Sequence, residues 1–152
     1  MSLESVRAFF RVNAPDVAII ETAVSSSTVE LAAKAHNVEP AQIAKTICLS
    51  VGDKVLLVVA SGTARLDNRK IKDAFGGKGR MLGADEVLAA TSHPVGGVCP
   101  FGLPSPLQVY CDVSLRCCAE VVPAAGSTNA PVRIATDRLA ALAGATWIDV
   151  CR

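Results

Sequence analysis

The residues best suited to chemistry lie in the segment 91–102, TSHPVGGVCPFG, which holds three glycines and two prolines. Glycine lets another molecule approach the main chain closely, and proline removes a backbone donor and stiffens the path. The remaining amide groups can therefore be aimed at a ligand, as in an oxyanion hole or an ester-binding site. An ordinary surface turn has a similar composition, so the segment alone leaves both interpretations open.

The same segment contains a thiol and an imidazole, Cys99 and His93. A cysteine hydrolase would use Cys99 as its nucleophile and His93 as its base. The sequence offers no clear carboxylate to orient His93, and a loop broken by prolines need not bring the two side chains face to face. We therefore expect Cys99 to be a packed small residue and keep the thiol hydrolase as an alternative.

Basic residues that could bind a ligand occur in two other parts of the chain. Lys45 leads into an apolar, β-branched run, so we expect it at the mouth of a buried strand, where a lysine commonly keeps its ammonium group in water. Residues 65–80 carry six cations against two acids, Asp67 and Asp73. This segment could contact phosphates, although a solvated helix face has the same composition. Its cations are Arg65, Arg69, Lys70, Lys72, Lys78 and Arg80.

The elements that must position these residues alternate between helices and strands. The spacing of apolar residues predicts helices at 2–12, 27–35 and 85–90, the second opened by a capping box of Ser27 and Glu30. Further short helices are predicted to begin at Pro40 and after the N-caps Asp67 and Thr136. Strands are predicted at 17–21, 46–51, 54–60, 107–111, 119–122, 132–135 and 147–150, the second and third forming a hairpin. This alternation indicates an α/β or α+β domain with a mixed sheet.

Length and composition exclude several classes of protein. The 152 residues suit one domain spanning 1–152, and 51% hydrophobic with 4% aromatic residues implies a core of small aliphatic side chains. The apolar run 55–60 is too short to cross a bilayer and the N-terminus is not that of a signal peptide, so we expect a cytoplasmic protein. Six cysteines without a CxxC pair and two distant histidines argue against a zinc site. Neither a P-loop nor a dinucleotide fingerprint is present.

Four short segments, in order along nearly the whole chain, resemble the YbaK family, which includes the editing domain inserted into bacterial prolyl-tRNA synthetases. They are AKTI at 44–47, SG at 61–62 ahead of LD at 66–67, GGVCPFG at 96–102, and GSTN at 126–129. The combination is far more specific than any one of these motifs. It implies a single α/β domain built on a mixed, barrel-like sheet.

The resemblance also implies an activity, the hydrolysis in trans of the ester that joins a wrong amino acid to transfer RNA. The expected substrate is tRNA(Pro) carrying a small amino acid such as alanine, cysteine, serine or threonine, and prolyl-tRNA synthetase is an expected partner. No cofactor, metal or side-chain nucleophile is expected, because family members are thought to position water with help from the neighbouring ribose hydroxyl. A histidine found in the second loop of some relatives is absent here, which leaves the amino-acid preference open. A non-catalytic module that binds RNA or a nucleotide in the same cleft is the alternative.

The family's functional residues map onto positions in this chain. Lys45 would hold a phosphate of the terminal adenosine, as suits a point charge. The GxxxP loop of the family corresponds to Gly96, Gly97, Val98, Cys99 and Pro100, whose amides would face the ester carbonyl. The substrate would also contact Phe101, Gly102, Gly126, Ser127, Thr128 and Asn129. Contacts to the RNA are expected from Arg65, Arg69, Lys70 and Lys72, giving an affinity that falls with salt.

Overall fold

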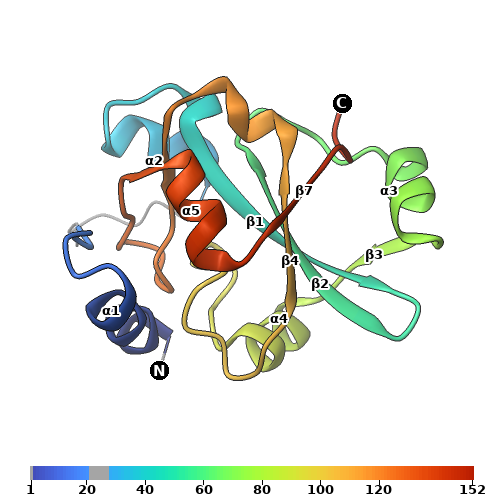
Figure 1. The fold of residues 1–152 in the computed structure, drawn as a ribbon, viewed down its shortest axis with the longest axis horizontal. Helices are drawn as coiled ribbons and strands as arrows, with labels where there is room; N and C mark the ends of the chain where they lie inside the picture. The colour runs from blue at the N-terminus through green and yellow to red at the C-terminus, as the bar shows by residue number, and fades with distance from the viewer. Residues whose placement is uncertain (1, 21–27) are drawn as a thin grey trace.

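A computed structural model describes residues 2–20 and 28–152 of the chain (Figure 1). Seven strands form one curled, mixed sheet in the order β6-β5-β1-β2-β4-β7, and β3 pairs with a further part of β1. The strands are β1 (Ile43–Val51), β2 (Lys54–Ser61), β3 (Gly79–Met81), β4 (Gln108–Asp112), β5 (Glu120–Pro123), β6 (Ile134–Ala135) and β7 (Thr146–Ile148). The α/β fold with a mixed, barrel-like sheet is confirmed.

Helices cover the sheet and its ends. The α-helices are α1 (Ser2–Asn13), α2 (Val29–Ala35), α3 (Asn68–Phe75), α4 (Ala84–Thr91) and α5 (Thr136–Ala143). Two short 3₁₀-helices are η1 (Pro40–Gln42) and η2 (Val113–Cys117). In Figure 1, α3 lies on the side of the C-terminus, whereas α1 and α5 lie on the opposite side.

The β1–β2 hairpin is the centre of the molecule. Its strands pair antiparallel from Ala44 with Ser61 to Val51 with Lys54, and Gly52 takes the positive φ (59°) that the two-residue turn requires. Alternate side chains of β2 enter two different cores: Leu57 belongs to the core that includes Phe10 of α1, and Val58 to the core that includes Ile71 of α3. Because both faces of β2 are buried, its sequence is almost continuously apolar.

Most predicted elements are confirmed, including the hairpin, the helix that Asp67 caps and the strand that became β7. The strand predicted at 17–21 is wrong, because only Ile19 forms an isolated bridge, to Val132, and residue 21 lies outside the described part of the chain. The strand predicted at 132–135 is shorter than expected, since β6 comprises only its last two residues.

Two predicted caps differ from those found. The N-cap of α2 is Thr28, whose hydroxyl accepts a hydrogen bond from Leu31 N–H at 3.1 Å, while Ser27 lies outside the described residues. Thr136 does not cap α5 but is its first residue, and its hydroxyl donates to the carbonyl of Cys118 at 2.6 Å. That tertiary hydrogen bond links α5 to the start of β5, a contact that local spacing cannot reveal.

Candidate functional site

A pocket of about 270 Å³ lies along one edge of β1. Its walls come from α2, from β1, from the chain just after β3, from α4, and from the two loops at 95–98 and 124–131. Most of the lining side chains are apolar, and the polar ones include Thr28, Lys45, Thr46 and Ser127. A larger hollow at the tip of the β1–β2 hairpin contains none of the residues in the family motifs. The pocket beside β1 is therefore the candidate site.

The pocket exists because β1 lacks a neighbouring strand along part of one edge. On that side β1 pairs with β5 only at Ile43 and Ala44, and with β3 only from Leu49 onward. Residues 45–48 lie between these pairings and form one wall of the pocket. An unpaired strand edge presents main-chain donors and acceptors, so this gap can hydrogen-bond a ligand.

Thr46 occupies the middle of the gap. Gly62 N–H donates to the carbonyl of Ile43 at 2.8 Å on the β2 side, and Leu82 N–H donates to the carbonyl of Cys48 at 3.4 Å on the other side. Since successive residues of a strand point their main-chain groups to opposite sides, the N–H and C=O of Thr46 point away from β2, toward the pocket. The Thr46 hydroxyl is buried and has no hydrogen-bond partner among the described residues. Among the described residues, Thr46 thus offers a hydroxyl that can both donate and accept, beside a main-chain edge that faces the pocket.

Lys45 is the first residue of the same gap, directly after the part of β1 that pairs with β5. Its side chain is half-buried, and its ammonium group donates to the carbonyls of Gly62, at 3.3 Å, and Ala64. Burial lowers the pKa of Lys45, and the neighbouring Arg65 charge lowers it further. An ammonium group has three donors, so one remains for an anion once these two carbonyls are satisfied.

A glycine makes this lysine contact possible. A Cβ atom at Gly62 would lie 2.2 Å from the carbonyl oxygen of Pro40 and 2.7 Å from a methyl group of Val29. No other residue fits that space, so the chain leaving β2 can pass this close to η1 and α2 only with glycine at position 62. The SG motif at 61–62 therefore has a physical reason that is independent of any family.

The two loops meet at Gly97. Its N–H donates to the carbonyl of Pro94 at 2.9 Å, and its own carbonyl accepts from Gly126 N–H at 2.9 Å. A Cβ atom at position 97 would lie 2.7 Å from the main-chain nitrogen of Ser127. The close contact joins the loops so that Gly96, Val98 and Ser127 all line the pocket.

The remainder of the segment 91–102 points into the core. Cys99 and Phe101 are fully buried, and neither lines the pocket. The ring of Phe101 packs against those of Phe9, with centroids 5.3 Å apart, and Phe10, at 4.9 Å. The segment therefore has a tip, residues 94–98, which reaches the pocket, and a base, residues 99–102, which anchors the tip to α1.

The geometry disfavours Cys99 as a nucleophile. Complete burial raises the pKa of its thiol to about 12. His93 Nε2 is 3.7 Å from the Cys99 sulfur but only 2.7 Å from the carbonyl oxygen of Phe101, to which it donates. His93 Nδ1 has no hydrogen-bond partner within the described residues, so no carboxylate orients the ring. A thiolate attacking a bound ester needs access and a base, and neither is present here.

Comparison with known proteins agrees with this site. Residues 24–142 match the model of the aminoacyl-tRNA editing domain family. The chain belongs to this family. A solved structure proposed to be a trans-editing enzyme for prolyl tRNA synthetase is similar, with 31% identity, a TM-score of 0.92, and an alignment over 99% of this chain and 97% of that one.

Two further relatives are similar to this chain over nearly their whole length. The uncharacterised protein YwhH of Bacillus subtilis (strain 168) is 44% identical over 154 residues, which cover 100% of this chain and 98% of YwhH. The hypothetical protein APE2540 is 28% identical, with a TM-score of 0.89 over 97% of this chain and 99% of its own. This editing domain is therefore similar to each of these proteins over essentially its full length.

Within the editing domain, the second loop contributes one predicted residue to the pocket. Ser127 lines it, whereas Gly126, Thr128 and Asn129 do not. The Ser127 hydroxyl donates to the side-chain oxygen of Asn129 and accepts from Asn129 N–H at 3.3 Å. These two bonds make a local turn that holds Ser127 at the pocket wall.

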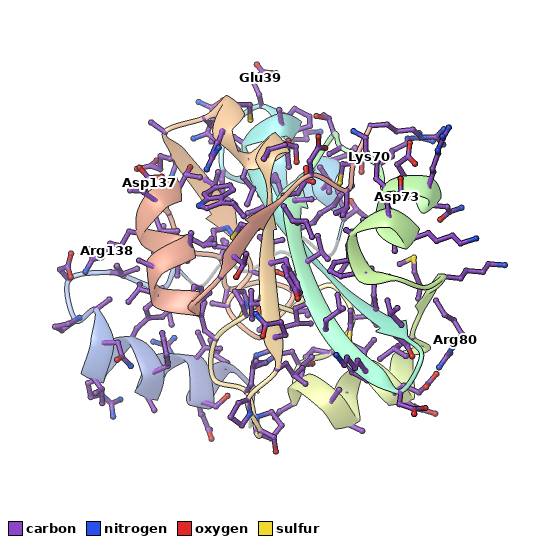
Figure 2. All side chains as sticks on the ribbon, turned by 45° about the vertical axis from the view of Figure 1, so that its right-hand side comes forward. Glu39, Lys70, Asp73, Arg80, Asp137 and Arg138 are labelled. Carbon is purple, nitrogen blue, oxygen red and sulfur yellow. The ribbon has the colours of Figure 1, made fainter. Side chains whose placement is uncertain are left out.

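The basic residues of the segment 65–80 that Figure 2 labels lie on the same side of the molecule as α3. Figure 2 shows Lys70 and Arg80 on one side of the molecule, with Arg138 on the other. Lys70 already bonds the Asp149 carboxylate at 3.0 Å and the Cys151 carbonyl at 2.7 Å, and Arg80 pairs with Glu86 at 3.2 Å. Arg65 is near enough to Lys45 for its charge to contribute to the lowered pKa of the Lys45 ammonium group.

Across residues 2–20 and 28–152, no cluster of three or more His, Cys, Asp or Glu side chains could hold a metal ion. None of the helices in these ranges combines the length and apolar character that a bilayer span needs.

Thr46 is not among the candidates predicted from the sequence, although it lies in the AKTI motif at 44–47. A threonine inside an apolar run is an ordinary strand residue. Its importance follows only from the missing neighbour of β1, which is a property of the assembled sheet.

Proposed function

We propose that this editing domain is a freestanding deacylase that hydrolyses the ester of mischarged tRNA, with tRNA(Pro) bearing a small wrong amino acid as its substrate. The observation that carries the proposal is the convergence of Lys45, the unpaired edge at Thr46 and the glycine-rich tip around one pocket. A charged anchor, a main-chain edge and a glycine-rich loop suit an aminoacyl ester on a terminal adenosine, which has a phosphate, an ammonium group and a carbonyl.

In the proposed reaction a water molecule attacks the ester carbonyl and loses a proton, the bond from the carbonyl carbon to the ribose oxygen breaks, and that oxygen takes up a proton and leaves as a hydroxyl, which releases the amino acid as its carboxylate. The negative charge that develops on the carbonyl oxygen would be met by main-chain N–H groups of the tip. Lys45 would hold the adenosine phosphate with its remaining donor. Positioning of this kind can lower a barrier by about 7–11 kcal/mol at most without a covalent intermediate.

Thr46 is our candidate for recognising the amino acid. The α-ammonium group needs acceptors in a largely apolar pocket, and the Thr46 hydroxyl has no hydrogen-bond partner among the described residues, while the Thr46 carbonyl points toward the pocket. Apolar neighbours such as Val98 and Val122 would then limit the size of the side chain. Such walls separate side chains that differ by one methylene by only ~1–3 kcal/mol, so exclusion of proline must depend on shape.

The test is deacylation of tRNA(Pro) charged separately with alanine, cysteine, serine, threonine and proline. We expect rapid loss of one or two of the small-residue esters and a spared prolyl ester. Lys45→Ala should lower the rate about 100-fold or more, because it removes the anchor that positions the ester. Lys54→Ala, an exposed lysine on the neighbouring strand, is the matched control. Decay of every ester at the buffer rate, with binding of tRNA retained, would instead favour the non-catalytic binding module.

A further inference from the structure

We propose that His93 is a positioning residue that clasps the two ends of the segment 93–101 and so sets the geometry of the tip at the pocket. The inference rests on the proposed function of the site, because it concerns the loop whose amides would face the ester. His93 itself does not line the pocket. It would act through the main chain of residues 94–98.

The clasp is a single hydrogen bond between the side chain of one end and the main chain of the other. His93 Nε2 lies 2.7 Å from the carbonyl oxygen of Phe101, eight residues later. A carbonyl only accepts, so Nε2 must carry the hydrogen, and Nδ1 then bears a lone pair. The absence of a partner for Nδ1 among the described residues fits this neutral form.

Both ends of the clasp are fixed to the rest of the protein. The His93 main-chain N–H donates to the Thr91 hydroxyl at 3.1 Å, and this hydroxyl donates to the Val87 carbonyl in α4 at 2.7 Å. At the other end, Phe101 is held between Phe9 and Phe10 of α1. His93 therefore joins α4 to α1 directly beneath the tip.

The clasp is isolated from water and from competing partners. His93 and Phe101 are both fully buried. The Cys99 sulfur, which is 3.7 Å from both Nε2 and the Phe101 oxygen, is the nearest alternative partner that the structure shows, and a thiol is a weak donor and acceptor. A buried carbonyl left without a donor is destabilising, so the imidazole is needed even though it does not reach the pocket.

The tip depends on this closure because its own hydrogen bonds are few. Those that the structure shows there are Gly97 N–H to Pro94 and Gly126 N–H to Gly97, each 2.9 Å long. If the ends of the segment separate, the Gly97 contact with the second loop changes, and with it the direction of the tip amides. Displacement of about 1 Å at a reacting centre can cost about 100-fold in rate.

The experiment compares His93→Leu, which removes the donor, with His93→Gln, whose amide can donate to the same carbonyl. For tRNA deacylation we expect kcat to fall about tenfold or more in His93→Leu, with KM changed by less than about twofold, since the anchor Lys45 is untouched. His93→Gln should recover most of kcat. His36→Gln is the control, because His36 is the other histidine and lies at the end of α2.

A second readout does not depend on activity. Hydrogen exchange measured on peptides covering 94–98 should be faster in His93→Leu than in wild type and close to wild type in His93→Gln, while peptides of β2 stay unchanged. The inference is overturned if His93→Leu matches wild type in both exchange and kcat, or if His93→Gln is as impaired as His93→Leu. If wild type hydrolyses no ester, the proposed function fails and the exchange comparison alone decides the clasp.

Nitrogen NMR of the wild-type imidazole covers the case in which His93→Leu does not fold. We expect a neutral ring with the hydrogen on Nε2. A ring with the hydrogen on Nδ1, or a charged ring at neutral pH, would overturn the inference.

Discussion

The tip (residues 94–98) and the base (residues 99–102) of the segment 91–102 are adjacent in sequence but are held in place by different interactions. The tip shapes the pocket with its main chain: Gly97 is needed because no Cβ fits against Ser127. The base is held by side chains, of which Phe101 is the largest and is fully buried. Substitutions in the tip should therefore change activity more than stability, and substitutions in the base should do the opposite.

The largest effect on activity is expected from Gly97→Ala. The new methyl group would lie 2.7 Å from the Ser127 nitrogen, so the two loops must move apart. We expect deacylation to fall about 100-fold or more, as measured with the mischarged tRNA that wild type prefers. Gly76→Ala is the control for backbone strain, because Gly76 has a positive φ that an alanine rarely adopts, but a Cβ atom there meets open space away from the pocket. Equal losses in both variants would contradict the distinction between tip and base.

Phe101→Ala should give the largest effect on stability. Removing a fully buried aromatic ring that contacts two others costs about 3–5 kcal/mol in the free energy of unfolding. Urea denaturation followed by circular dichroism measures this directly. A loss below about 1 kcal/mol would show that the base does not anchor the segment.

The loss of stability at acid pH should depend on the buried side chain of His93. Burial lowers the pKa of His93 in the folded protein. At a pH below 6.5, the ordinary pKa of histidine, the unfolded chain therefore binds a proton at this residue more readily than the folded protein does. Stability should therefore fall as the pH drops from about 7 toward 5.5, and His93→Gln should show a smaller fall. His36, whose pKa burial also lowers, contributes equally to both proteins and cancels in the comparison. Identical pH profiles would mean that His93 is not the group responsible.

The smallest effect is expected from Cys99→Ala. The thiol is buried in the base, and its pKa is raised to about 12 by that burial. Stability should fall by about 1 kcal/mol, while the deacylation rate of the folded variant stays within about twofold of wild type. Complete inactivation of a folded Cys99→Ala protein would instead support the alternative that the protein is a cysteine hydrolase.

Local chemistry made much of the fold predictable. The β1–β2 hairpin follows from two apolar runs around Gly52, and α3 follows from the cap Asp67 and the stop at Gly76. The strand expected at 17–21 failed because, within the described residues, Ile19 forms only an isolated bridge, to Val132, which itself lies outside the strands of the sheet.

The site was less predictable than the fold, because it depends on contacts between distant residues. Lys45 and the tip could be singled out as candidates, and the structure brings both to one pocket. The separation of tip from base could not be predicted, since it depends on α1 reaching Phe101. The role of Thr46 depends on where β5 stops pairing and β3 begins.

The gap along β1 also bears on the solubility of the protein. An exposed strand edge usually invites pairing with another chain and hence aggregation. Here β5 and β3 close the gap at both ends, and only residues 45–48 stay unpaired between them. A stretch this short, recessed beneath two loops, can hydrogen-bond a small molecule but cannot align with a foreign strand. The same arrangement that admits a ligand therefore protects the sheet edge from polymerising.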